Sequence, residues 1–258
     1  MVDWMGLPAL ASEHGGRLDA MLAWIHVVML ALFVGWGAFF VYLLVRFRRS
    51  RNPVADYEGT KSHMSSYLEG LVVVLEVIFL VGFSFPLWAE RVRDFPPEEE
   101  AVAVRIVAEQ FAWNIHYPGP DGVYGRTSID LIDVAANPLG VDASDPAGAD
   151  DIVTLNQLHL PVDKPAMIRL TSKDVIHGLA LQEMRVKQDA VPGIDVPVWF
   201  VPTVTTAEMR EIKQKPTYNY EIACAQLCGL THYRMRGFLT VHEQADFDAW
   251  IREQAAGS

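Results

Sequence analysis

The segment CAQLCGLTHYRM, residues 224–235, holds both cysteines of the chain. Cys224, Cys228, His232 and Met235 offer two thiolates, an imidazole and a thioether. This donor set suits copper better than magnesium, calcium or manganese, and zinc seldom recruits Met. A blue-copper site uses a single Cys, so two thiolates that bridge a pair of copper ions fit the segment better.

A copper pair of this kind needs a second imidazole from another part of the chain. The candidates outside the long apolar segments are His116, His159, His177 and His242. We favour His177, because it follows the strand-like segment MIRLTS and a loop there can reach the cysteine segment. For the other three, a hydrogen-bonded surface residue is the simpler interpretation. A disulfide between the cysteines is the metal-free alternative, although four-residue spacing makes its geometry awkward.

Two long apolar segments precede this part of the chain. Residues 21–45 carry no charge, and residues 67–89 are interrupted within the apolar run only by Glu69 and Glu76. Each is long enough to cross a hydrocarbon core of about 30 Å. The basic loop RFRRSR between them predicts a cytoplasmic hairpin, with both termini on the opposite side of the membrane. We therefore predict a membrane anchor over residues 1–93.

The pattern changes after the proline-containing linker RDFPPEEE. Residues 94–258 contain short alternating segments, AVAVRIVA, MIRLTS, YNYEIACA and GFLTVHE, separated by Pro, Gly, Asn and Asp. Such segments predict an antiparallel sandwich or Greek-key barrel. Residues 118–151, rich in Pro, Gly and Asp, predict a long surface excursion. Residues 247–255 predict a short amphipathic helix that closes the chain.

Charge divides the chain at the same place. Residues 1–93 hold eight basic and eight acidic side chains, whereas residues 94–258 hold thirteen and twenty-four, so the net charge of −11 lies on the second part. That charge either serves solubility or attracts a basic partner. Its sign and its predicted extracytoplasmic location exclude nucleic acid as a partner.

Two segments resemble subunit II of the haem–copper cytochrome c oxidases, of bacterial type. CAQLCGLTHYRM is similar to that family's binuclear copper loop, Cys-x-Glu-x-Cys-Gly-x-x-His-x-x-Met, and DVIHGLALQEMRVKQDAVPG is similar to its upstream ligand segment. Together with two amino-terminal spans, the resemblance covers nearly the full chain. It implies a two-helix transmembrane hairpin followed by an all-β cupredoxin-like Greek-key domain.

The resemblance also implies a ligand set for two copper ions. Cys224 and Cys228 would bridge the ions, His177 and His232 would each bind one, and Met235 would be a weak ligand. Gln226 would bind through its backbone carbonyl. The family has Glu at that position, where its carboxylate helps to hold an interface magnesium ion. An amide brings no charge, so support for that magnesium site is weak here.

Four further residues match positions with roles in the family. Phe111 stands where the family's electron-receiving Trp stands, and Trp113 matches the next aromatic position, which we interpret as packing. Asp189 matches an acidic position of the cytochrome-docking face, although a solvated turn residue is an equal alternative. Glu69 lies near the position of a proton-channel entry residue. Glu76 has no family counterpart, and we expect it to face a neighbouring subunit.

The function implied is that of the electron-entry subunit of a terminal oxidase in the bacterial cytoplasmic membrane, with its copper domain periplasmic. Electrons would pass from cytochrome c, or an equivalent carrier, through the copper centre to haem in subunit I, where oxygen is reduced and protons are pumped. The chain has no Cys-x-x-Cys-His haem attachment site, so the donor is expected to be a separate protein. Partners implied are subunits I and III and the bilayer; membership of a respiratory supercomplex stays open.

Two other classes compete with this interpretation. A copper-delivery or thiol-redox protein would also use Cys-x-x-x-Cys with a distant His, but such proteins lack His and Met after the second cysteine. A purely structural subunit would have lost the ligands. The presence of His232 and Met235 argues against both.

Overall fold

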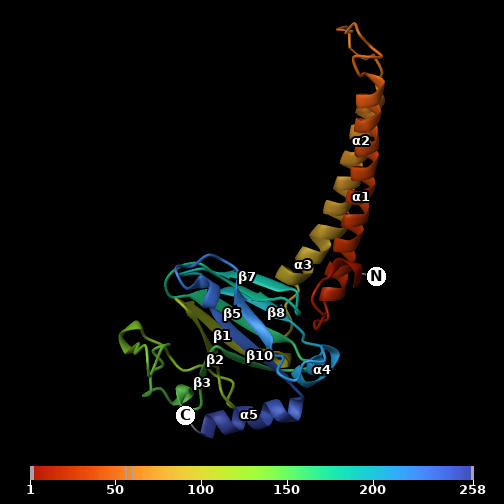
Figure 1. Ribbon diagram of the computed structural model, residues 1–258. Coiled ribbons are helices and arrows are strands. Elements are labelled where there is room, and N and C mark those ends of the chain that lie inside the picture. The colour runs from red at the N-terminus through yellow and green to blue at the C-terminus, as the bar shows by residue number, and fades with distance from the viewer. Residues whose placement is uncertain (1–2, 56, 60, 257–258) are drawn as a thin grey trace. The chain divides into compact units, whose positions relative to one another are not determined.

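The computed structural model describes residues 3–55, 57–59 and 61–256. The chain divides into two compact units, a helical one and a β-rich one. The helical unit comprises Met1–Leu7 and Arg17–Glu90, and the β-rich unit comprises Pro8–Gly16 and Arg91–Ser258. We describe each unit by itself (Figure 1).

The helical unit consists of two long apolar helices. The first is α1, Gly15–Arg46. The second runs over Met64–Arg93 and consists of α2 (Met64–Val77), a π-helical segment η2 (Ile78–Ser84) and α3 (Phe85–Arg93). Both are long and apolar enough to cross a membrane. They extend beyond the predicted spans 21–45 and 67–89, because each helix continues into its polar flanks.

The two helices share a common groove and a few polar contacts. Leu32 of α1 and Leu75 of α2 line that groove, and Arg17 forms an ion pair with Glu90. Almost all other apolar side chains of the hairpin face outward, and no residue of the apolar window in either helix is buried. So much exposed apolar surface is stable only in lipid or against other apolar chains.

The β-rich unit contains two five-stranded sheets that pack face to face. The first sheet has the order β3-β2-β1-β5-β8 and the second β4-β10-β9-β6-β7. The strands of the first are β1 (Val102–Glu109), β2 (Ala112–Tyr117), β3 (Ile152–Leu155), β5 (Ala166–Ser172) and β8 (Val196–Phe200). Those of the second are β4 (Gln157–Pro161), β6 (His177–Leu181), β7 (Val186–Ala190), β9 (Tyr220–Cys224) and β10 (Arg236–His242).

Most strand pairs are antiparallel, as in the predicted sandwich, but each sheet also contains one parallel pair. In the first sheet β1 pairs with β5 in parallel, from Val102 opposite Ala166 to Ala108 opposite Ser172. In the second, β10 pairs with β4 in parallel. Both pairs join strands that are far apart in sequence, and the chain crosses to the other sheet between them. A hairpin connection cannot join parallel strands, so a crossover of this kind is needed.

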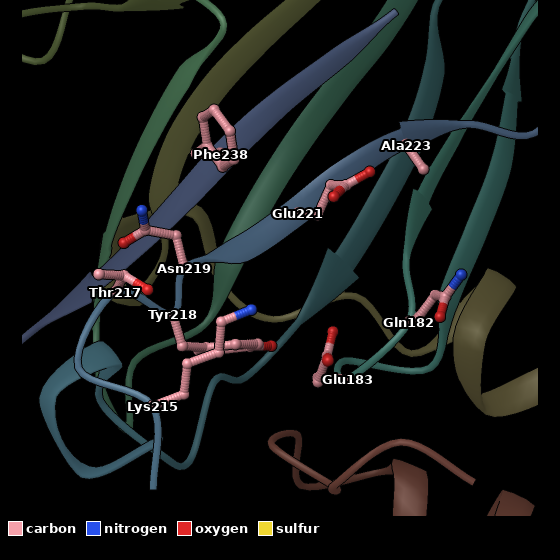
Figure 2. A pocket seen from close by; sticks show the side chains of 9 residues that line it. All are labelled: Gln182, Glu183, Lys215, Thr217, Tyr218, Asn219, Glu221, Ala223 and Phe238. Atoms are coloured by element: carbon pink, nitrogen blue, oxygen red, sulfur yellow. The ribbon is translucent and has the colours of Figure 1, made fainter. Parts of the chain in front are cut away.

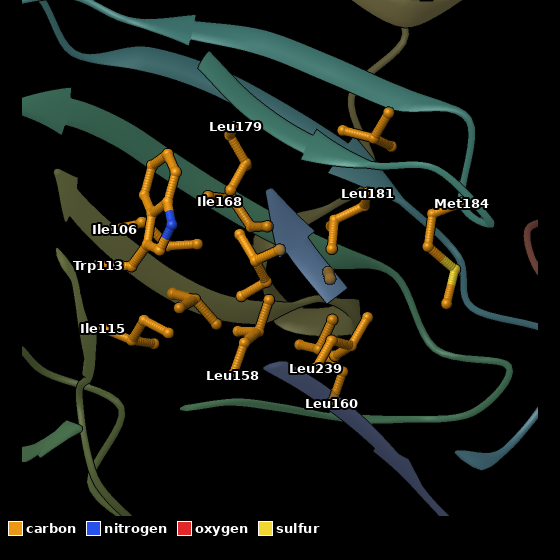
Figure 3. Packing of buried hydrophobic residues seen from close by; sticks show 14 of the residues in the cluster. Ile106, Trp113, Ile115, Leu158, Leu160, Ile168, Leu179, Leu181, Met184 and Leu239 are labelled. Atoms are coloured by element: carbon orange, nitrogen blue, oxygen red, sulfur yellow. The ribbon is translucent and has the colours of Figure 1, made fainter. Parts of the chain in front are cut away.

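The inward faces of the two sheets form one apolar core (Figure 3). Strand β1 alternates strictly, with Val104, Ile106 and Ala108 fully buried. Trp113 of β2 lies among Ile106, Ile115 and Leu158 in this view, and is itself fully buried. Because well-packed cores fix the strands that surround them, this core sets the positions of the loops at the strand ends.

The amino-terminal segment Pro8–Gly16 belongs to the β-rich unit, which the sequence-based division at residue 93 did not anticipate. Ala11 is fully buried, and the Ser12 hydroxyl donates to the Met184 carbonyl at 2.7 Å. The backbone of Ala11 bonds to Glu183 and Thr203. The segment therefore adds both core and hydrogen bonds to the domain.

The β-rich unit also contains the helices α4 and α5. Helix α4, Thr206–Ile212, was not predicted; it starts at a capping box in which Thr205 and Glu208 exchange side-chain bonds to the backbone. Helix α5, Gln244–Ala256, corresponds to the predicted helix 247–255 and begins three residues earlier. Its Trp250 packs at 4.1 Å on the ring of His159.

Residues 118–151 form the predicted excursion, which we call the excursion loop. They contain no strand or α-helix, only the short 3-10 turns Ile129–Leu131 and Pro146–Gly148. Side-chain bonds to the loop's own backbone hold its shape: Asp133 accepts from Ala135 and Ala136, and Asn137 bonds both ways with Val141. The loop is thus ordered without a core of its own.

Candidate metal centre

The predicted ligand atoms form a continuous chain at one end of the two sheets. His177 Nδ1 lies 3.9 Å from Cys224 Sγ, which lies 3.8 Å from Cys228 Sγ. Cys228 Sγ in turn lies 3.5 Å from His232 Nδ1 and 3.8 Å from Met235 Sδ. Ligand atoms of His177, Cys224 and Cys228 all lie within 4.8 Å of one another, so these three alone could hold a metal ion.

The backbone carbonyl of Gln226 completes this set. Its oxygen lies 3.2 Å from Cys224 Sγ, whereas its side chain is exposed. Both cysteines are free thiols, and their 3.8 Å separation is well beyond a disulfide bond of about 2.05 Å. The disulfide alternative therefore does not describe this structure.

The spacing of these atoms fits metal ions that bridge them. Metal–sulfur and metal–nitrogen bonds of about 2.0–2.3 Å around a tetrahedral ion place neighbouring ligand atoms about 3.3–3.8 Å apart. The separations of 3.5–3.9 Å from His177 through Cys224 and Cys228 to His232 match this range closely. The donor set therefore fits a metal site built on two thiolates and two imidazoles.

Strand ends position the ligands. His177 is the first residue of β6, Cys224 is the last of β9, and Met235 directly precedes β10. The Ala225 amide donates to the Gly178 carbonyl at 2.8 Å, which fixes residues 224–235, the ligand loop, against β6. A Cβ at Gly178 would lie 3.0 Å from the Gln226 nitrogen, so this close approach depends on glycine.

Asp174 orients the His177 ring. Asp174 Oδ1 lies 2.8 Å from His177 Nε2, which leaves Nδ1 directed toward Cys224. The Gln110 amide donates to Asp174 Oδ2 at 2.7 Å, and the Gln110 side chain donates to the Cys228 carbonyl at 2.5 Å. Partial burial raises the pKa of Asp174, but the hydrogen bonds from the His177 ring and from the Gln110 and Val175 amides outweigh it and hold that pKa below its ordinary value.

The site is mostly enclosed by the core. His177 is fully buried, and Cys228 and Met235 are nearly so. Burial, with Cys224 close by, raises the pKa of the Cys228 thiol to about 11. The cost of ionising such a thiol is offset when a cation binds, because coordination to a metal ion stabilises the thiolate. The donor set thus favours a bound metal, whose charge would offset the cost of ionising the buried thiol.

The structure places the remaining predicted residues at different distances from this centre. The Trp113 ring meets the His177 ring edge-on, with centroids 6.2 Å apart. The half-buried Phe111 packs beside Gly229 in the ligand loop. Asp189 is exposed on β7, opposite Gly178 in the ladder, and is not a turn residue. Glu69 lies on α2 of the helical unit.

The interpretation of His116, His159 and His242 as surface residues needs correction. His116 is buried and lies 2.7 Å from Asp151. His159 and His242 are hydrogen-bonded to each other at 2.8 Å and half-buried. All three are hydrogen-bonded as predicted, and none is in the metal cluster.

Sequence reasoning missed two groups of residues around the centre. Asp174 and Gln110 orient it, and the Asp of the DVIH segment was a signal that could have identified the first. Leu227, Leu230 and Tyr233 project from the ligand loop and are 78%, 92% and 74% exposed. Their only signal was an apolar character inside a polar loop.

A pocket of about 350 Å³ lies away from the ligand atoms (Figure 2). It is lined by Gln182, Glu183, Lys215, Thr217, Tyr218, Asn219, Glu221, Ala223 and Phe238. None of the predicted ligands is among them. The pocket is thus separate from the candidate metal centre.

The chain resembles known proteins over most of its length. Residues 102–241 match the family model of the periplasmic domain of cytochrome c oxidase subunit II. The chain is 31% identical over 218 residues to the alternative cytochrome c oxidase subunit 2 of Bradyrhizobium diazoefficiens, covering 84% of this chain and 72% of that one. It is 26% identical over 284 residues to cytochrome c oxidase subunit 2 of Thermostichus vulcanus, covering 98% and 81%. Among solved structures, the periplasmic domain of cytochrome oxidase subunit II from Bradyrhizobium japonicum is 25% identical, covers 60% of this chain and 94% of its own, and has a TM-score of 0.41.

Proposed function

Because the chain belongs to the cytochrome c oxidase subunit II family, we propose that it is the electron-entry subunit of its oxidase, with a two-copper centre at His177, Cys224, Gln226, Cys228, His232 and Met235. The family makes it a component of a haem–copper oxidoreductase. The observation that carries the proposal is the unbroken chain of donor atoms, each 3.5–3.9 Å from the next.

The chain's own residues suit electron transfer. A copper pair held by these residues would supply one-electron chemistry, with the charge shared between two ions. Asp174 and Gln110 fix the ligands from outside the metal, and the buried core beneath Cys228 leaves little room for them to move. Ligands that stay in place during oxidation and reduction lower the reorganisation needed for each transfer.

Phe111 supports an entry route for the electron. It is half-buried and packs beside Gly229, which is exposed in the ligand loop. We assign the route to Phe111, and assign Trp113, which is fully buried behind His177, to packing.

The electron donor docks on the outer surface of the β-rich unit. We propose cytochrome c or an equivalent basic carrier, attracted by the net charge of −11 that lies on residues 94–258. Asp189 is exposed one register position from His177, where it contributes to this attraction. The exposed Leu227, Leu230 and Tyr233 supply the apolar contact that electrostatic steering alone does not give.

The two apolar helices and the periplasmic-domain match make the chain a membrane-anchored subunit with its copper domain in the periplasm. We propose that residues 1–93 anchor it in the bacterial cytoplasmic membrane and that both termini lie on the periplasmic side. The outward apolar faces of the hairpin then contact lipid and the haem–copper subunit I, with subunit III as a further partner. Glu69 serves as the proton-channel entry residue, and Glu76 faces a neighbouring subunit.

The first test is copper stoichiometry and electron paramagnetic resonance on the full chain, purified in detergent and loaded with copper. The expected result is two copper ions per chain that share one unpaired electron. One copper ion per chain, or a disulfide between Cys224 and Cys228 that excludes copper, would favour the copper-delivery interpretation instead. The Asp189→Asn variant should then slow reduction by cytochrome c at low salt, whereas equal rates would remove Asp189 from the docking surface.

A further inference from the structure

A groove of about 500 Å³ lies between the outer face of the first sheet and the excursion loop. Its floor is formed by β1, β2 and β5, and its other walls by the excursion loop and by residues 193–195. The lining residues that matter below are Arg105, Arg169, Lys173, Ile132, Leu139 and Ile194. The candidate metal centre contributes none of its ligands to this groove.

Two arginines lie side by side on the floor. Arg105 of β1 and Arg169 of β5 are register partners in the parallel pair, so both side chains project from the same face of neighbouring strands about 4.8 Å apart. Like charges placed directly opposite each other destabilise a sheet. Nothing in the core requires this pair, because both residues are on the outer face.

Neither arginine is well neutralised by the protein. Arg105 lies over the Tyr124 ring at 3.8 Å, and no carboxylate forms an ion pair with it in the part of the chain that the structure describes. Arg169 reaches Asp195 only at 3.6 Å, with both side chains about half exposed. An exposed pair at that distance contributes little.

Other ionisable groups around the groove already form ion pairs with each other. Lys173 is bonded to Glu109 at 2.7 Å, and the buried His116 is bonded to Asp151. In the excursion loop, Asp142 and Asp145 pair with Arg126. None of these carboxylates therefore supplies the counter-charge that the two arginines lack.

We propose that this groove binds a small organic anion, a phosphate or carboxylate on an apolar body, with its charged group between Arg105 and Arg169. Guanidinium groups present planar pairs of donors that match the oxygens of such anions. The apolar body lies against Ile132, Leu139 and Ile194, which line the same groove. An anion here also relieves the repulsion between the paired arginines.

The test uses the copper-loaded full chain in a neutral detergent, titrated with phenyl phosphate by calorimetry. Arg105→Gln and Arg169→Gln should each weaken binding about tenfold or more, since each removes a charge-assisted contact. Arg236→Gln is the matched control, because Arg236 is also an exposed strand arginine 3.6 Å from a carboxylate, that of Glu221, in the other sheet. It should leave the affinity unchanged.

Two comparisons make the result decisive. Inorganic phosphate, which lacks the apolar body, should bind more weakly than phenyl phosphate, and phenol, which lacks the charge, should not bind. Copper content serves as the check that each variant is folded. No binding of phenyl phosphate to the unmodified chain at millimolar concentration, or equal weakening by Arg236→Gln, would overturn the proposal.

Discussion

The β-rich unit fixes two of its loop regions by opposite means. The ligand loops, residues 172–178 and 224–235, are short and are held by the core: His177 and Cys228 are buried, and Gln110, from a neighbouring turn, donates to Asp174 in the first loop and to Cys228 in the second. The excursion loop, 118–151, is long and is held largely by its own side chains, such as Asp133 and Asn137, which bond to the loop backbone.

The difference shows what each region can do. Loops anchored in a packed core hold side chains to the fixed positions that a metal centre needs. A loop held by surface hydrogen bonds opens locally at low free-energy cost. It can therefore roof a groove and admit a ligand, but it cannot impose geometry on a metal. Equivalent substitutions in the two regions should give unequal effects.

The largest effect should follow from Cys228→Ser. Cys228 contacts three other donor atoms, those of Cys224, His232 and Met235, so its loss removes the centre of the ligand chain. We expect the two-copper centre to be abolished, as measured by copper per chain and by electron paramagnetic resonance. An intact mixed-valence spectrum in this variant would rule out the ligand assignment.

The next largest effect should follow from Asp174→Asn. Loss of this carboxylate frees the His177 ring, and changes of this kind typically lower metal affinity by about 10- to 100-fold. Competition with a copper chelator measures the affinity. Asp133→Asn is the same change in the excursion loop and should leave the affinity unaltered; equal losses in both variants would mean that the two regions are not independent.

Met235→Leu should have a smaller effect on the same centre. Leucine fills the buried space of Met235 but offers no sulfur, while the thiolates and imidazoles remain. We expect full copper content and a shifted reduction potential, because a weak ligand tunes a copper site without holding it. Spectroelectrochemical titration measures the shift. Loss of all copper would show that Met235 is essential for binding.

The clustering of the candidate ligand atoms was predictable because most of its information is local. Five of the six proposed ligands fall within one twelve-residue segment, and the residue types in it favour copper. The fold class was also predictable and is confirmed: the alternating residues of β1 and β5 identify strands, and the two apolar segments identify the helices. Strand β6, His177–Leu181, was missed because all five residues are buried and no alternation marks it.

The rest depends on contacts between residues far apart in the chain. Ala11 joins the β-rich unit through backbone hydrogen bonds to Glu183 and Thr203, and no local sequence pattern predicts such a contact. The parallel pairing of β1 with β5 likewise follows from how the sheets assemble. Helix α4 does not depend on such long-range contacts. Its capping box, Thr205 and Glu208, is a local sequence signal from which the helix could have been predicted.

Stability should fall as pH decreases from about 6.5 to about 4. Burial and the neighbouring His242 lower the pKa of His159 to about 4, and burial also lowers the pKa values of His116 and His242 despite their carboxylate neighbours Asp151 and Asp246. Unfolded histidines titrate near 6.5 and take up protons first, so acid favours unfolding in this window. Circular dichroism melts of the copper-free chain measure the effect, and His159→Gln should flatten the profile. A constant melting temperature across the window would contradict it.

The smallest effect should follow from Asp133→Ala, and it should be confined to the excursion loop. The Asp133 carboxylate accepts from the Ala135 and Ala136 amides, and those bonds hold its pKa below the ordinary value. Without it, hydrogen exchange at these two amides should accelerate several-fold, because no buried contact replaces the lost bonds. Copper content and exchange at the amide of Ala225, in the ligand loop, should not change. Faster exchange at Ala225 as well would show that the excursion loop and the ligand loops open together, and the contrast between a core-anchored and a self-anchored loop would then fail.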